Sequence, residues 1–71
     1  MKNEYIETPV ISSNIESVGW GNDLLNVKFK TGAVYQYENV KKETYELLIG
    51  AESVGRAFNT LIKNSYNYKK I

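Results

Sequence analysis

The sequence predicts a small α+β domain: a three-stranded antiparallel β-meander followed by two short helices, with room for a C-terminal edge strand. Apolar and polar residues alternate between residues 16 and 40, as in strands with one buried face. After that stretch the apolar period changes to about 3.6 residues, as in amphipathic helices. The length of 71 residues suits one domain. We expect residues 1–13 to form a loosely ordered lead-in and residues 14–71 a single domain.

The first two strands follow from this alternation. The first begins near Glu16 and ends at a turn rich in small and polar residues. The second, residues 24–30, alternates cleanly, which is typical of an antiparallel strand with one face in the core. Its apolar residues Leu25, Val27 and Phe29 are expected to share the buried face.

The length of the loop before the third strand decides where Tyr35 and Tyr37 point. A two-residue loop would place both tyrosines among lysines. A three-residue loop over residues 30–32, closed by a glycine in the left-handed region, pairs Val27 with Tyr35 and Leu25 with Tyr37. Because only this register collects the apolar side chains on one face, we expect both tyrosines to be mostly buried.

Two amphipathic helices are predicted after the third strand, which ends at Val40. The first has an apolar stripe over residues 45–49, with Asn39 as a candidate N-cap and Gly50 as a left-handed stop. Ser53 is a good N-cap for the second helix. The apolar stripe of that helix comprises Val54, Ala57, Phe58, Leu61 and Ile62.

The composition argues against several functional classes. The chain has no cysteine and no histidine, so we expect no disulfide framework, no structural zinc site and no cofactor. The carboxylates are scattered, without calcium-loop spacing, and no nucleophile stands beside an evident base, so we expect no catalytic residues. No apolar run approaches a membrane span, and the N-terminus is polar and acidic, unlike a secretory signal. We therefore expect a cytoplasmic protein without a membrane partner.

The charges are unevenly distributed. Residues 56–71 carry four basic and no acidic side chains, although the net charge is only +1. A basic end with aromatic residues between the charges suits phosphates and bases. A solvated helix face with a soluble tail would have the same composition. Within this end, residues 66–68 alternate again and allow the short edge strand.

The start of the second helix is the best candidate for a ligand site. Free backbone N–H groups and the positive end of the helix dipole are expected there. Gly55 allows close approach, and Arg56 and Asn59 supply directional donors. The structural alternative is that Ser53 caps the helix, Gly55 packs on the sheet and Arg56 reaches solvent. The remaining candidate ligand-binding residues are Lys63, Tyr37, Trp20, Tyr66 and Tyr68.

A set of short motifs occurs in a fixed order between residues 12 and 71: Ser13, Val18-Gly19-Trp20, Leu25-Asn26-Val27-Lys28-Phe29, Gly32, Tyr35-Gln36-Tyr37, Val40, Tyr45, Ala51-Glu52-Ser53-Val54-Gly55, Phe58-Asn59, Ile62 and Tyr66-Asn67-Tyr68. With these motifs the chain resembles the KTSC domain, a small module at the C-terminus of some lysyl-tRNA synthetases that also occurs as a stand-alone bacterial or phage protein. The resemblance carries over no established activity, and the synthetase context suggests RNA binding.

Three functions stay open at this point. The leading one is a non-catalytic binding module for a nucleotide or RNA, in which aromatic rings stack on bases and cations contact phosphates. The first alternative is a stand-alone phage-type protein that sequesters a small signalling nucleotide in a pocket between protomers. The second is a protein-interaction adaptor that uses a free sheet edge. A homo-oligomer is expected, because so short a chain without crosslinks leaves apolar surface in water.

Overall fold

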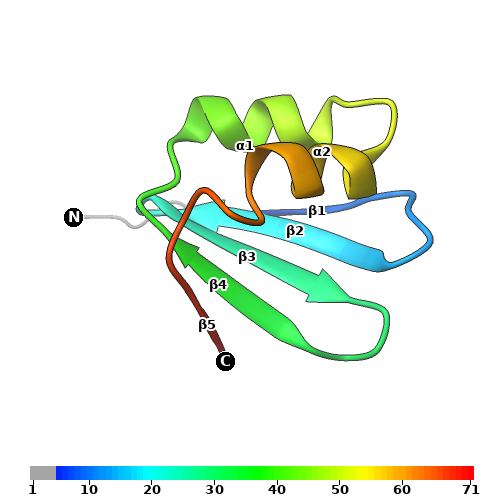
Figure 1. The fold of residues 1–71 in the computed structure, drawn as a ribbon, viewed down its shortest axis with the longest axis horizontal. Helices are drawn as coiled ribbons and strands as arrows, with labels where there is room; N and C mark the ends of the chain where they lie inside the picture. The colour runs from blue at the N-terminus through cyan, green and yellow to red at the C-terminus, as the bar shows by residue number, and fades with distance from the viewer. Residues whose placement is uncertain (1–4) are drawn as a thin grey trace.

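The structure is a computed structural model that describes residues 5–71. Five antiparallel strands form one sheet in chain order, and both helices lie on the same side of it (Figure 1). The α+β fold class is therefore confirmed. The elements are β1 (Ile6–Pro9), β2 (Ile15–Gly21), β3 (Leu24–Phe29), β4 (Val34–Glu38), α1 (Lys42–Ile49), α2 (Val54–Leu61) and β5 (Tyr68–Lys70).

The sheet is wider than the sequence pattern predicts, so the three-stranded meander is wrong. Strand β1 precedes the meander and pairs with β2, with Ile6 opposite Trp20. It forms from the segment 1–13 that was expected to be loosely ordered, of which the first four residues lie outside the described part. A four-residue strand ending at Pro9 has too little alternation to stand out in the sequence. Proline suits this edge position because it lacks an N–H to donate to a further strand.

The C-terminal edge strand allowed by the sequence is present. Strand β5 covers Tyr68–Lys70, shifted towards the C-terminus from the alternating residues 66–68. It pairs antiparallel with β4, and Tyr68 lies opposite Tyr37. The C-terminal residues of the chain thus return to the sheet and form its edge beside β4 of the β3–β4 hairpin.

The β3–β4 hairpin has the predicted register. Leu25 lies opposite Tyr37 and Val27 opposite Tyr35. Gly32 has a φ of +99°, which confirms the left-handed residue expected in the loop. Tyr37 is only 3% exposed, whereas Tyr35 is half-buried and packs against the core. Both tyrosines therefore face the helices, as the register argument requires.

The core fills the space between the sheet and the two helices. The Trp20 indole N–H donates to the Val40 carbonyl at 2.7 Å. The Trp20 ring also stacks on Tyr45 of α1, with ring centroids 6.4 Å apart. These contacts fasten α1 to the sheet. The buried apolar residues are Ile15, Val18, Trp20, Leu25, Val27, Tyr37, Val40, Tyr45, Leu48, Val54, Phe58 and Ile62.

The helix ends agree only in part with the sequence pattern. Ser53 caps α2 as predicted, because its Oγ accepts from the Arg56 N–H at 3.3 Å. Asn39 is not the cap of α1, which begins after Lys41. Instead Asn39 has a φ of +61° in the preceding turn, a conformation that asparagine tolerates well. Gly50 does end α1, but in the right-handed region, so the left-handed stop is wrong.

Tyr37→Ala should lower the free energy of unfolding by about 3 kcal/mol or more, because it removes a buried aromatic ring. Gln36→Ala is the matched control, since Gln36 lies on the other face of the same strand and should cost less than about 1 kcal/mol. Urea denaturation measures both values. Similar losses for the two variants would contradict the register.

Gly32→Ala tests the loop itself. No atom lies within 4 Å of the position that a Cβ would take at Gly32, so the substitution strains only the backbone. It should lower the free energy of unfolding by about 1 kcal/mol or more. Gly32→Asn should lose less, because asparagine tolerates positive φ. Equal stability of the alanine variant and the wild type in urea denaturation would rule out this strain.

Candidate ligand-binding groove

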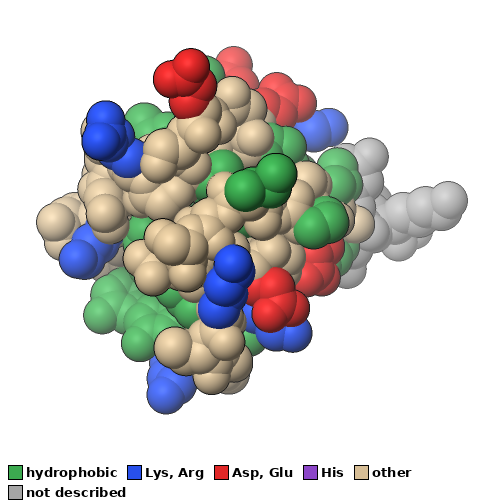
Figure 2. All heavy atoms as spheres, turned by 90° about the vertical axis from the view of Figure 1, so that its right-hand side faces the viewer, with side chains coloured by type: hydrophobic (Ala, Val, Ile, Leu, Met, Phe, Trp, Pro, Cys, Tyr) green, Lys and Arg blue, Asp and Glu red, His purple; other side chains and the backbone are tan. Residues whose placement is uncertain are grey.

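A groove of about 980 Å³ opens on the helix-covered side of the sheet. Its walls are α2, the β4–β5 edge of the sheet, and the loop of residues 11–14 that precedes β2. Figure 2 shows hydrophobic side chains at the lower left of the molecule, with Lys or Arg side chains above and below them. The lining of the groove itself includes the aromatic residues Phe29 and Phe58 and the cations Arg56 and Lys63.

The interior of the groove is an aromatic cluster in which every ring contacts another. Tyr68 stacks on Tyr35 at a centroid distance of 5.5 Å and an interplanar angle of 17°. It also lies 5.2 Å from Tyr37. Phe58 meets both Tyr37 and Phe29 edge-on, each at 5.7 Å. The aromatic cluster comprises Phe29, Tyr35, Tyr37, Phe58 and Tyr68, all of which line the groove.

Each member of the aromatic cluster is placed by its element. Tyr35 and Tyr37 are two residues apart on β4 and therefore share a face. The antiparallel pairing of β5 sets Tyr68 opposite Tyr37. Tyr68 remains 55% exposed, so part of its ring is available to a ligand. An exposed ring held by its neighbours is a suitable surface for stacking a planar group.

Two cations border the aromatic cluster. Arg56 on α2 and Lys63 just after it line the groove and are exposed to solvent. Within residues 5–71 the ion pairs are Lys28 with Glu16 and Lys41 with Asp23, so neither groove cation is paired. Positive charge that no carboxylate of residues 5–71 pairs with is therefore available to an anion at the groove.

The N-terminus of α2 is already partly used by the protein. Ser53 Oγ accepts the Arg56 N–H, which removes that donor from a ligand. A Cβ on Gly55 would stand 3.4 Å from Ser12 Oγ, so the missing side chain lets the 11–14 loop pack close to the helix. Ser12 Oγ in turn accepts from the Ile15 N–H at 3.3 Å. Ser53 is therefore a cap, as the structural alternative has it, whereas Gly55 packs against the 11–14 loop and not on the sheet; both residues also line the groove.

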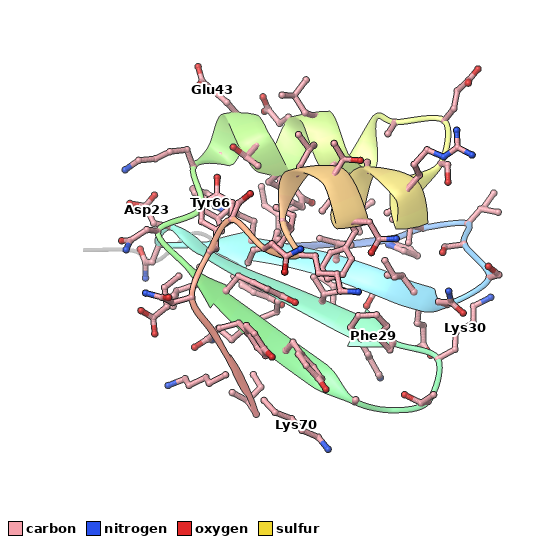
Figure 3. The ribbon with its side chains drawn as sticks, viewed as in Figure 1. Asp23, Phe29, Lys30, Glu43, Tyr66 and Lys70 are labelled. Carbon is pink, nitrogen blue, oxygen red and sulfur yellow. The ribbon has the colours of Figure 1, made fainter. Side chains whose placement is uncertain are left out.

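The groove brings together most of the residues that the sequence indicated. Trp20 is not among them, because it is buried and its N–H is bonded in the core. Tyr66 packs against the core, and Figure 3 shows it at the opposite end of the molecule from Lys30. The predicted residues that line the groove are Ser53, Gly55, Arg56, Asn59, Lys63, Tyr37 and Tyr68.

Other lining residues were not indicated by the sequence. Phe29, at the end of β3 (Figure 3), and Phe58 were predicted to be core residues, and they serve the core and the groove together. The loop of residues 11–14 was assigned mostly to the lead-in. Ile11 in that loop is 98% exposed although it lines the groove. Only the resemblance, which began at Ser12, hinted that this loop belongs to the domain.

The hydroxyl of Tyr37 has an unusual setting. Burial raises its pKa from the ordinary value of 10.0, and the nearby Tyr68 and Tyr35 hydroxyls raise it further. The group therefore stays protonated at neutral pH and can donate a hydrogen bond.

The groove is lined by charged, aromatic and hydrogen-bonding side chains. Its polar groups are mainly a guanidinium, an ammonium, amides and hydroxyls, with Glu52 as the one lining carboxylate. Within residues 5–71 no group of three or more His, Cys, Asp or Glu side chains is placed to hold a metal ion. In the same part of the chain, neither helix has the length and apolar character needed to cross a membrane.

Comparisons with known proteins identify the family. A family model, the KTSC domain, matches residues 11–66. An uncharacterised protein of Stutzerimonas stutzeri (strain A1501) is 40% identical over 63 residues, which cover 84% of this chain and 89% of that protein. A protein of Tsukamurella paurometabola is 40% identical over 57 residues, covering 78% of this chain and 85% of its own length.

The same family appears among solved structures. The crystal structure of a KTSC domain protein from Yersinia pestis is similar with a TM-score of 0.88 and 33% sequence identity. The similarity covers 96% of this chain and 99% of that chain, so the two proteins share the whole fold. The matched residues 11–66 include the 11–14 loop, the β3–β4 hairpin and α2, which build most of the groove. The chain belongs to the KTSC domain family.

Proposed function

We propose that this chain is a non-catalytic module that binds a nucleotide in the groove. The observation that carries the proposal is the aromatic cluster, with Tyr68 partly exposed, beside the unpaired cations Arg56 and Lys63. A nucleotide combines a planar base, which stacks on aromatic rings, with a phosphate, which attracts cations. The aromatic cluster would contact the base of such a ligand, and the cations would contact its phosphate.

The size and charge of the protein favour a short ligand. A groove of about 980 Å³ lies at the upper end of the range for small-molecule sites. A net charge of +1 is low for a surface that neutralises many phosphates. A single nucleotide unit within a flexible RNA strand has the same chemistry as a free nucleotide. The experiment below therefore compares the free and the polymeric form.

Arg56→Ala should weaken binding of a nucleoside monophosphate by about 10-fold to 100-fold, because a charge-assisted bond to phosphate is lost. Lys42→Ala is the matched control, since Lys42 is an exposed cation of α1 and does not line the groove. Calorimetric titrations with AMP, GMP, CMP and UMP at two salt concentrations give the affinities. A wild type that binds none of them, or an Arg56→Ala variant of unchanged affinity, would contradict the proposal.

A short single-stranded RNA in the same titrations separates the two sources of nucleotide. If the strand continues past the groove, replacing both Lys69 and Lys70 with alanine should lower the log–log salt slope by about two units. If only one nucleotide is held, the double variant should bind AMP and the RNA as the wild type does. Interaction with another protein, without affinity for either probe, would support the adaptor alternative.

We also propose that copies of the chain associate through the mouth of the groove. Ile11 is 98% exposed there, and an aliphatic side chain this exposed gains by being covered. A second copy placed on Ile11 would enclose the ligand between protomers, as the sequestering alternative requires. Leu47 is 65% exposed but lies on α1, away from the groove, and serves as a matched control position.

Sedimentation at micromolar concentration should therefore show a species heavier than one chain. Ile11→Ser should shift it towards the monomer, because the substitution removes apolar surface from the proposed contact. Leu47→Ser should leave the distribution unchanged. A single-chain boundary for the wild type at every concentration would exclude the pocket between protomers.

A further inference from the structure

Two buried tyrosines differ in what their hydroxyls contact. Tyr45 is 2% exposed, and its hydroxyl lies 2.6 Å from Thr8 Oγ1, within hydrogen-bond distance. Tyr37 is 3% exposed, yet no hydrogen bond within residues 5–71 involves its hydroxyl. Buried polar groups nearly always have a partner.

The unpaired Tyr37 hydroxyl is open to the groove. Asn26 Oδ1 is the one fully enclosed side-chain polar atom that lacks a partner in residues 5–71. The Tyr37 hydroxyl is also unpaired. It is not fully enclosed, however, so it retains some accessible surface. Because Tyr37 lines the groove and is otherwise surrounded by aromatic rings, this surface faces the groove. A ligand there meets a donor that the protein itself does not satisfy.

The buried residues and the charged residues lie in different parts of this groove. Tyr37 and Phe58 are buried, whereas Arg56 and Lys63 are exposed at the rim. A phosphate placed at the buried end would leave water without reaching a cation, which is costly. A base carbonyl or ring nitrogen is uncharged and needs only one donor.

Resting on the nucleotide function proposed above, we infer that the Tyr37 hydroxyl donates a hydrogen bond to an acceptor atom on the nucleobase. The base enters the groove edge first against the aromatic cluster, and the phosphate stays at the rim with Arg56 and Lys63. Tyr37 thus acts through its hydroxyl and Tyr68 through its ring. The raised pKa of the Tyr37 hydroxyl is consistent with this role, since the donor keeps its proton across the neutral range.

Tyr37→Phe tests the role because it removes only the hydroxyl. The affinity for the nucleoside monophosphates that bind the wild type should fall by about tenfold, as for the loss of one hydrogen bond. The melting temperature should not fall, because no hydrogen bond within the protein is lost. Tyr45→Phe is the matched control and should behave in the opposite way. It breaks the contact with Thr8 and should lower the melting temperature while leaving the affinity unchanged.

Ligand fragments test the orientation. Tyr37→Phe should weaken binding of the nucleosides, which have no phosphate, and leave ribose 5-phosphate unaffected. Arg56→Ala should give the reverse pattern. Nucleotide affinities unchanged by Tyr37→Phe, or ribose 5-phosphate weakened by it, would overturn the orientation while the nucleotide site stands. A wild type that binds neither nucleotides nor nucleosides would overturn both proposals.

Discussion

The register of the β3–β4 hairpin is the constraint on which the rest of the structure depends. Gly32 at a φ of +99° closes a three-residue loop that sets Val27 opposite Tyr35. A slip of one residue would turn the tyrosines of β4 to the face without helices. Phe58 of α2 would then lose its edge-on contact with Tyr37. The core and the aromatic cluster therefore follow from the same local choice of loop.

The parts of the fold that could be predicted are those with strong local signals. The alternation of β3, the amphipathic stripe of α2 and the Ser53 cap are each visible within about ten residues of sequence. Strand β1 is different, because its order comes from distant partners such as Trp20, which lies opposite Ile6. The prediction that Asn39 caps α1 was wrong for a related reason. Asparagine suits helix caps and left-handed turns alike, and the sequence does not tell which one the chain needs.

The residues of the candidate site also divide into those that the sequence indicated and those that it did not. Arg56 and Lys63 line the groove, as their places at the second helix and in the basic C-terminal stretch indicated. Aromatic residues are ambiguous, because the same ring can fill a core or line a site. Trp20 proved to be core, whereas Tyr68 reaches the groove only because β5 folds back beside β4. That return joins residues about thirty positions apart and leaves no periodic trace in the sequence.

The two ends of the sheet handle polar groups in contrasting ways. Around Trp20, the indole N–H and the hydroxyls of Tyr45 and Thr8 have partners within the protein. Around Tyr37, the Tyr37 hydroxyl and the two rim cations Arg56 and Lys63 have none among the described residues. Because the Tyr37 hydroxyl retains accessible surface in the groove, water can hydrate it until a ligand takes the place of that water. The end around Trp20 holds the fold together, whereas under the proposed function the polar groups around Tyr37 would contact the ligand.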